Sequence, residues 1–201
     1  GYESIDAFAG GLTKGEITII GGRPGHGKTT FMINLLSRMI HSGLRIAFFS
    51  RELPNSELLK KLLTLESGKL SYGMVRKGIF EQSDLQELEY IKDKMTDWYA
   101  KEKFVMFDHI RDFSNTAGEV RKFKPDVVFD DYLQLIQPHG IFDQRRLQLE
   151  QLVNDYKWVA KENRCAVVLA SQLNRAIETR ADPIPQLSDL AESGAIEQVA
   201  E

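Results

Sequence analysis

The sequence predicts an α/β domain whose mostly parallel, twisted β-sheet is covered by helices on both faces. The main observation is that short apolar runs of strand character alternate along the chain with stretches of helical pattern. The length of 201 residues suits one such domain with a substantial core. No repeat, low-complexity tract or linker divides the chain, so we expect residues 1–201 to form a single domain.

Five short runs rich in apolar and β-branched residues are the predicted strands, and they cover residues 17–20, 46–49, 104–107, 127–129 and 166–170. Stretches with helical spacing of apolar residues are the predicted helices, and they cover residues 31–40, 58–65, 83–95 and 149–159. Pro54 is expected in the first turn of the second helix, where its missing N–H costs nothing. The loosest region is predicted at 174–188, and a loop of this length inside a compact domain is usually functional.

Composition and charge narrow the class of protein. The content of 42% hydrophobic and 27% charged residues is typical of a soluble globular domain, and no apolar run approaches the roughly 20 residues of a membrane span. The single cysteine, Cys165, excludes an internal disulfide and fits a reducing, cytoplasmic setting. A net charge of −3 argues against a broad basic surface for DNA. Any nucleic acid would have to be held by loops, by backbone amides or by several subunits together.

A phosphate-binding loop (P-loop) is the strongest motif, and it consists of Gly22-Arg23-Pro24-Gly25-His26-Gly27-Lys28-Thr29. A predicted strand precedes it and a predicted helix follows it, which is the context that the motif requires. Its glycines let backbone N–H groups turn toward phosphate oxygens, and the helix N-terminus adds partial positive charge. We expect this loop and Thr30 to bind ATP, with Lys28 at the β- and γ-phosphates and Thr29 at magnesium. Arg23 and His26 are interpreted as variable loop residues, and His26 is assigned no metal.

Polar side chains follow three other predicted strands. Asp130 and Asp131 end the fourth strand, where a carboxylate could hold magnesium through water, and the local pattern leaves both candidates open. Glu52 follows the second strand and could orient or deprotonate the attacking water, although an exposed loop acid is an equally good interpretation. Gln172 follows the fifth strand and could contact the γ-phosphate. In a parallel sheet these strand ends form the ligand crevice.

Together and in this order, the motifs resemble the ATPase domain of the DnaB family of replicative helicases over nearly the whole chain. The resemblance rests on Gly10-Gly11-Leu12, Gly15-Glu16, Arg23-Pro24, Gly27-Lys28-Thr29, Ser50-Arg51-Glu52-Leu53, Asp131-Tyr132-Leu133-Gln134-Leu135, Ser171-Gln172-Leu173-Asn174-Arg175, Leu187-Ser188-Asp189-Leu190, Glu192-Ser193-Gly194 and Ile196-Glu197-Gln198. The motifs from Ser171 onward are the specific ones, because very many families share a P-loop.

The resemblance implies a RecA-like P-loop NTPase core in a homo-hexameric ring, which encircles one DNA strand and moves along it using ATP and Mg²⁺. It assigns phosphate and magnesium to Lys28 and Thr29, and it selects Asp131 as the magnesium residue. It implies that Glu52 activates water and that Gln172 senses the γ-phosphate. The residues that it places at single-stranded DNA are Arg175, Ala191, Glu192, Ser193 and Gly194.

Some features depart from the family's usual pattern. Ala191 stands where the family has arginine, which removes one expected phosphate contact, although backbone amides at Gly194 could serve instead. Arg51 and His26 stand where apolar residues are more common. The resemblance also implies that an arginine finger lies beyond Glu201 and that an N-terminal primase-docking domain is missing. Primase and a helicase loader would then bind outside these residues, in the cytoplasm of a bacterium or of a phage-infected host.

Other classes remain open. A RecA- or RadA-type recombinase shares the core but forms filaments on DNA, and the runs 131–135 and 171–175 favour the helicase over it. A nucleotide-controlled RecA-fold assembly switch, of the circadian-clock type, would lack hydrolysis stimulated by DNA. A purely structural module would need a vestigial P-loop, yet the candidate catalytic residues are all present.

Overall fold

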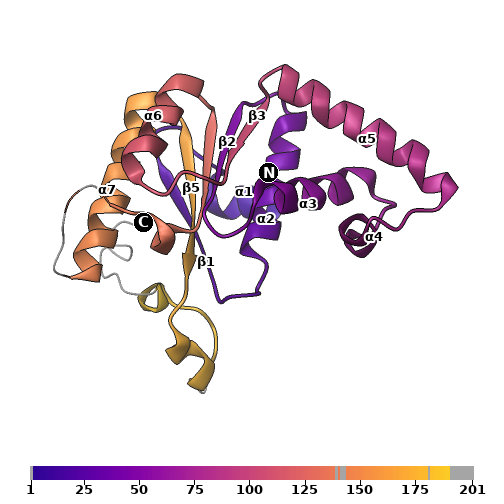
Figure 1. The fold of residues 1–201 in the computed structure, drawn as a ribbon. Coiled ribbons are helices and arrows are strands. Elements are labelled where there is room, and N and C mark those ends of the chain that lie inside the picture. The colour runs from indigo at the N-terminus through magenta and orange to yellow at the C-terminus, as the bar shows by residue number, and fades with distance from the viewer. Residues whose placement is uncertain (1, 139, 141–143, 181, 191–201) are drawn as a thin grey trace.

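In a computed structural model, which describes residues 2–138, 140, 144–180 and 182–190, the chain forms a parallel sheet of five strands in the order β1-β5-β4-β2-β3 (Figure 1). The strands are β1 (Ile17–Gly22), β2 (Ile46–Ser50), β3 (Phe104–Phe107), β4 (Val127–Asp131) and β5 (Ala166–Gln172). All five predicted strands are confirmed. Every strand except β3 runs one or two residues past its predicted end, into the residues of the motifs.

The described helices are α1 (Glu3–Ala9), α2 (Lys28–His41), α3 (Asn55–Ser67), α4 (Tyr72–Lys77), α5 (Gln82–Ala100), α6 (Phe113–Phe123) and α7 (Arg145–Asn163). The predicted helices lie within α2, α3, α5 and α7, whereas α1, α4 and α6 were not predicted. Polar residues dominate the first turn of helix α6 after Phe113. The capping carboxylate of Asp112, which accepts a hydrogen bond from the Asn115 N–H (2.8 Å), defines its start.

The expected position of Pro54 in the first turn of α3 was wrong. Pro54 lies directly before α3 rather than inside its first turn, with an extended backbone (φ −67°, ψ 150°). The missing N–H is equally harmless there, because a residue that caps a helix N-terminus donates no hydrogen bond within the helix. The fixed φ of proline therefore suits either position, and the pattern alone does not separate them.

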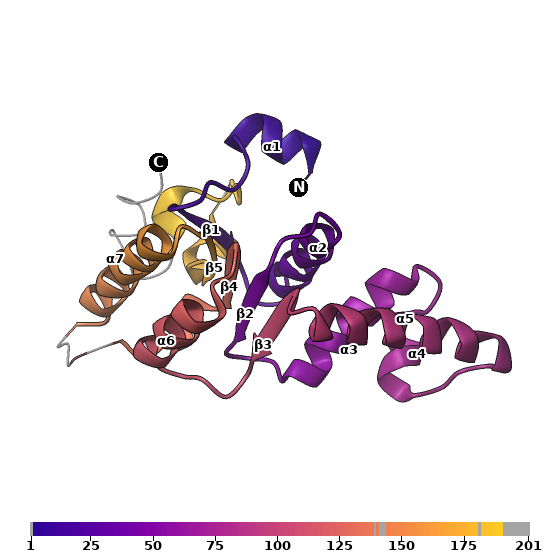
Figure 2. The same ribbon diagram turned by 90° about the horizontal axis from the view of Figure 1, so that it is seen from above.

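Alternating side chains of the strands enter two separate hydrophobic cores. On one face, Phe49 and Val128 pack with α6 and α7, and on the other face, Phe48 and Phe129 pack with α2, α3 and α5. Figure 2 shows the sheet between these two layers of helices. The predicted sheet with helices on both faces is confirmed.

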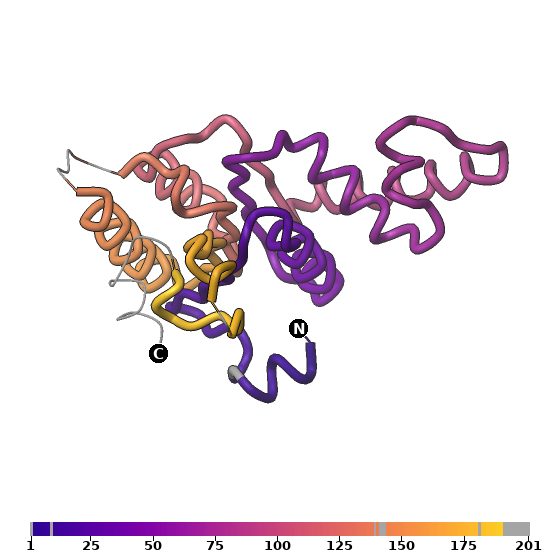
Figure 3. Tube along the Cα trace, turned by 90° about the horizontal axis from the view of Figure 1, so that it is seen from below, coloured from indigo at the N-terminus to yellow at the C-terminus, as the bar shows by residue number. Residues whose placement is uncertain are grey.

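The segment from α3 to α5 extends away from the sheet beyond β3, on the side opposite α7 (Figures 1 and 3). Helix α1 lies outside both layers, and Tyr2 joins its start to α2. The Tyr2 ring stacks on Phe31 with 5.7 Å between centroids, and the Arg38 guanidinium lies 4.2 Å from the same ring. In the described part of the chain, each helix is too short or too polar to cross a lipid bilayer.

A buried carboxylate ties α2 to α3 and α5. The side chain of Glu66, on α3, is 4% exposed, and it accepts hydrogen bonds from the Ser37 hydroxyl and from Lys94 Nζ (2.9 Å), while His41 Nε2 lies 2.9 Å away. The Trp98 ring covers this cluster and contacts both His41 and Lys94. Burial acts to raise the pKa of the Glu66 carboxyl, but the hydrogen bonds outweigh it and hold that pKa below its ordinary range.

We expect Glu66→Gln to lower the free energy of unfolding by about 1–3 kcal/mol at neutral pH, because the buried donors lose a charged acceptor. The folded-state pKa is depressed, so this contribution is complete above the unfolded-state pKa and is lost as the pH falls through the folded-state pKa. The difference in Tm between wild type and variant should therefore shrink as the pH falls below about 4, the ordinary range of a glutamate carboxyl. Thermal melts measure it. Glu162→Gln, at the exposed Arg121–Glu162 pair, is the matched control with little effect, and a difference that widens in acid would contradict this account of Glu66.

Candidate nucleotide-binding site

The ends of four neighbouring strands bring the predicted site residues to one edge of the sheet. Strands β1 and β5 end side by side, with Gly22 opposite Gln172, and β2 and β4 end with Ser50 opposite Asp131. Strands β5 and β4 are neighbours as well. The P-loop, Gln172, Asp131 and the residues after β2, including Glu52, therefore lie at one edge of the sheet, at the carboxyl ends of the strands. Ligands of open parallel sheets bind at this edge, which we call the crevice.

The P-loop leaves β1 and leads directly into α2, which begins at Lys28. Gly25 (φ 77°) and Gly27 (φ 84°) adopt the left-handed backbone region, which residues with a Cβ rarely occupy, so the turn depends on these two glycines. Lys28 Nζ donates hydrogen bonds to the carbonyl oxygens of Gly22 (2.9 Å) and Arg23 (3.3 Å). The ammonium group thus lies inside the loop, where phosphate oxygens would compete for the same N–H groups. Three further residues that are predicted to bind ATP are exposed, and they are Pro24, His26 and Thr30.

Thr29 and Asp131 are in direct contact. The Thr29 hydroxyl donates a hydrogen bond to Asp131 Oδ2. Asp131 is 1% exposed, and its second oxygen, Oδ1, is buried without a hydrogen-bond partner. A buried carboxylate oxygen beside a threonine hydroxyl is the hard oxygen donor set that Mg²⁺ prefers, so these two residues fit that ion.

Charges around the crevice influence one another. Burial raises the pKa of the Asp131 carboxyl, the hydrogen bond from Thr29 and the charge of Lys28 oppose this, and the charge of Glu52 adds to it. Burial lowers the pKa of the Lys28 amine against the charges of Asp131 and Glu52. Glu52 is exposed. One cation and two carboxylates therefore lie within electrostatic range of each other, with Glu52 on the solvent side.

The two consecutive aspartates of β4 have different surroundings. Asp130 is fully buried and forms an ion pair with Arg51, and the Tyr156 hydroxyl donates a further hydrogen bond to it. Its neighbour Asp131 contacts the P-loop helix instead. Successive side chains of a strand point to opposite faces, which separates the two. This arrangement favours Asp131 as the magnesium residue and gives Asp130 a different role.

The side chain of Gln134 holds the backbone of Gln172. Its N–H donates to Gln134 Oε1 (3.2 Å), and Gln134 Nε2 in turn donates to the Ser171 hydroxyl (3.0 Å). Gln134 belongs to the short 3₁₀ helix Leu133–Leu135 directly after β4. Its amide therefore links the turn after Asp131 to the end of β5. The sequence pattern included Gln134 in a motif but did not indicate this contact.

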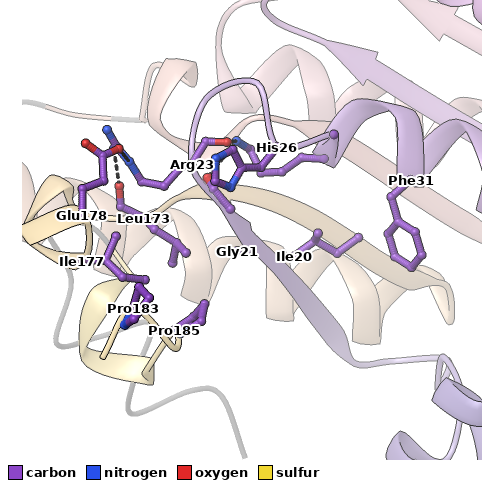
Figure 4. Close-up of a pocket in the computed structure, with 13 residues that line it drawn as sticks. Ile20, Gly21, Arg23, His26, Phe31, Leu173, Ile177, Glu178, Pro183 and Pro185 are labelled. Carbon is purple, nitrogen blue, oxygen red and sulfur yellow. Dashed lines mark hydrogen bonds and ion pairs between the residues drawn. The ribbon is translucent and has the colours of Figure 1, made fainter. Parts of the chain in front are cut away.

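Arg23 makes specific contacts that its interpretation as a variable loop residue did not anticipate. It is 8% exposed, its Nε donates to Glu178 (2.6 Å), and its Nη1 donates to the Leu173 carbonyl (2.8 Å). Leu173 and Glu178 both lie after β5, far from Arg23 in the sequence, so the local pattern around Arg23 does not predict these contacts. Figure 4 shows this link beside a cavity of about 580 Å³ between the P-loop and the segment after β5. The apolar residues on its wall are Ile20, Phe31, Leu173, Ile177, Pro183 and Pro185.

The segment after β5 is more ordered than the predicted loose loop at 174–188. It contains the 3₁₀ helices Arg175–Thr179 and Leu187–Asp189, and Arg180 pairs with Asp189 through two hydrogen bonds, one of 3.0 Å. The Asn174 N–H also donates to the Asp189 carbonyl (2.7 Å). These long-range side-chain and backbone contacts give it shape despite its polar, proline-containing sequence. Arg175 is exposed at its start. The remaining DNA candidates lie outside the described residues, and they are Ala191, Glu192, Ser193 and Gly194.

Comparison with known sequences agrees with these motifs. A family model described as the DnaB-like helicase C terminal domain matches residues 1–201. The whole chain is 30% identical over 206 residues to a probable plasmid replicative DNA helicase of Chlamydia psittaci, of which it covers 44%. It is 32% identical over 212 residues to the replicative DNA helicase DnaB of Haemophilus influenzae, again covering 44%. The chain thus spans less than half the length of these curated relatives.

Solved structures agree as well. The whole chain superimposes with a TM-score of 0.89 and 28% identity on a DnaB-like replicative helicase studied for its interactions with primase, of which it covers 49%. It superimposes equally well, with a TM-score of 0.89 and 28% identity, on a second solved structure, described as an ATPase domain, of which it covers 72%. These likenesses confirm the predicted RecA-like fold, and with the match along all 201 residues they show that the chain belongs to the family of DnaB-like helicase C-terminal domains.

Proposed function

We propose that this chain is the ATP-driven motor domain of a replicative DNA helicase, which hydrolyses ATP to move along single-stranded DNA and unwind the duplex. The observation that carries the proposal is the Thr29–Asp131 contact beside Lys28, together with the second Asp131 oxygen, Oδ1, which is buried without a hydrogen-bond partner. This is the arrangement that magnesium nucleotide binding requires, in a chain whose family and relatives are named for helicase activity.

Each residue of the crevice has a distinct task in this proposal. The P-loop amides and Lys28 bind the phosphates, and Lys28 exchanges its present carbonyl acceptors for phosphate oxygens, which form stronger charge-assisted hydrogen bonds. Thr29 and Asp131 would hold Mg²⁺, which, when bound, neutralises charge on the phosphates. Glu52 orients the attacking water and accepts its proton, and Gln172 contacts the γ-phosphate.

The same proposal assigns DNA contact to 174–194, which includes Arg175. Arg23 connects the P-loop to the described part of this segment through Leu173 and Glu178. A change at the P-loop on nucleotide binding therefore has a direct route to it. With a net charge of −3, one subunit would bind DNA weakly, and we expect binding by a homo-hexameric ring to depend strongly on salt.

The assembly completes the site in this proposal. A neighbouring subunit supplies an arginine that stabilises charge on the transferred phosphate, a contribution worth roughly 10³ to 10⁵ in rate. Primase and a loader are the further partners, and the bacterial relatives favour the cytoplasm of a bacterium or of a phage-infected host. Residues 1–201 act as one motor domain.

The test is to measure ATP turnover of the full-length protein with and without single-stranded DNA, together with unwinding of a forked duplex. We expect DNA to stimulate turnover, and we expect Lys28→Ala to abolish turnover and weaken nucleotide binding because it removes the only lysine in the phosphate cradle. Turnover without any response to DNA would favour an assembly switch, and open filaments rather than closed rings in electron micrographs would favour a recombinase. Unchanged turnover in Lys28→Ala would refute the site.

Glu52→Gln should leave ATP binding nearly intact and slow hydrolysis by about 10²-fold or more. The carboxylate acts on water during the reaction, whereas binding depends on the P-loop. A fluorescent nucleotide titration and single-turnover hydrolysis separate the two steps. The neighbouring acid Glu57, on α3, is partly exposed and contacts Lys60 and Tyr72, so it provides the control Glu57→Gln. Equal losses of binding and turnover in Glu52→Gln would identify a structural residue instead.

Asp131→Asn and Asp130→Asn should differ in kind. Asp131→Asn should raise the Mg²⁺ concentration needed for nucleotide binding, because it removes the charged oxygen donor at the crevice. Asp130→Asn should change that requirement less and should lower Tm more, because it leaves the buried Arg51 charge without its counterion. Mg²⁺ titrations of nucleotide affinity and thermal melts measure these effects, and the reverse ranking would mean that Asp130 is the magnesium residue.

A further inference from the structure

A buried arginine lies directly behind the crevice. Both Arg51 and Asp130 have fully buried side chains, and the guanidinium contacts both carboxylate oxygens, with Nε 2.9 Å from Oδ1 and Nη2 paired to Oδ2. Two further donors are used as well, since Nη1 donates to the Ile110 carbonyl (2.7 Å) and Nη2 donates to the Thr116 hydroxyl (2.8 Å). The pair is therefore a planar, two-point contact that further hydrogen bonds support.

Helices α6 and α7 hold this pair from outside. Thr116 lies on α6, and its hydroxyl donates to the Asp112 carbonyl (2.8 Å). Tyr156 lies on α7 and donates to Asp130 Oδ2, and its ring meets the edge of Phe113 on α6 with 5.0 Å between centroids. Four elements, β2, β4, α6 and α7, thus converge on a single ion pair.

The two partners immediately precede the two carboxylates of the crevice. Arg51 is followed by Glu52, and Asp130 is followed by Asp131. The Arg51 N–H donates to the Asp131 carbonyl (2.8 Å), and Arg111 Nη1 donates to the Arg51 carbonyl (2.7 Å). The peptide group that leads into Glu52 is therefore held, and so is the one that leaves Asp131.

Stability by itself does not account for such a pair. A buried ion pair loses the hydration of both charges, and matched apolar side chains at such sites often give an equally or more stable protein. What apolar contacts lack is direction, because they tolerate sliding, whereas a forked guanidinium–carboxylate pair sets both distance and angle. The feature that this pair can supply is therefore fixed geometry between the ends of β2 and β4.

We propose that Arg51 is a positioning residue for ATP hydrolysis: its pair with Asp130 fixes the ends of β2 and β4 and so sets the placement of Glu52 relative to Asp131. This inference rests on the proposed function of the crevice. It assigns Arg51 no contact with nucleotide, since the side chain is wholly buried on the α6 and α7 side of the sheet.

The test compares Arg51→Met, Asp130→Leu and the double variant Arg51→Met/Asp130→Leu in the full-length protein. Each single variant leaves one buried charge unpaired and should lower Tm by about 6 °C or more. The double variant buries no charge and should regain most of that Tm. We nevertheless expect it to keep its nucleotide affinity without Mg²⁺, to need more Mg²⁺ for tight binding, and to hydrolyse ATP about 10-fold or more slowly. The control is Arg121→Met/Glu162→Leu, an exposed pair between α6 and α7, which should hydrolyse ATP like the wild type.

A double variant with wild-type Tm, Mg²⁺ requirement and kcat would overturn the proposal and make the pair purely structural. Should the double variant fold poorly, Arg51→Lys and Tyr156→Phe decide, since both keep the Asp130 charge paired but loosen its geometry. We expect kcat to fall in both with unchanged nucleotide affinity, and a wild-type kcat in both would refute positioning. If the wild type itself hydrolyses no ATP, the proposed function fails, and the Mg²⁺ dependence of nucleotide binding then judges the role of Arg51 independently.

Discussion

The parallel arrangement of the five strands is the constraint on which the crevice depends. Parallel strands connected by helices all end at the same edge of the sheet. Residues that follow different strands, and that are far apart in the sequence, therefore come together at that edge. The order β1-β5-β4 puts the end of β5 between the P-loop strand and the strand of Asp131. Gln172, opposite Gly22 at the end of β5, therefore lies at the same edge as the P-loop and Asp131.

The two-residue period of a strand connects the core to the crevice. In β4 this alternation buries Asp130 behind the sheet and places Asp131 at the crevice. Directly after β2, Arg51 is likewise buried, whereas Glu52 is exposed at the crevice. The ion pair behind the sheet and the carboxylates of the crevice are therefore covalent neighbours. A change that loosens the packing of α6 and α7 around Arg51 and Asp130 therefore acts one peptide group away from Glu52 and Asp131.

The crevice also connects to the segment that follows β5. Arg23 leaves the P-loop and binds that segment at Glu178, while Gln134 holds the backbone of Gln172 from the turn after β4. Both contacts join loops that follow different strands, and both are made by side chains within the motifs. The loops at this edge thus form one connected unit. The hydrogen bonds of Arg23 give a change at the phosphates a physical route to the segment after β5.

The sequence by itself determined the class of fold, the five strands and the identity of the crevice, because apolar alternation and P-loop spacing are local patterns that backbone geometry imposes. It also led to Asp131 through the family resemblance. Only the tertiary structure decided the partners of Arg51 and Arg23, and the order within the segment 174–188. The partners of Arg51 and Arg23 lie tens of positions away or more, where the order of strands and the packing of helices bring them together. The contacts within 174–188 are closer in sequence, but they join side chains that no periodic pattern pairs. A buried arginine and an exposed one look the same in a sequence, and burial differs only once the chain has folded around its counterion.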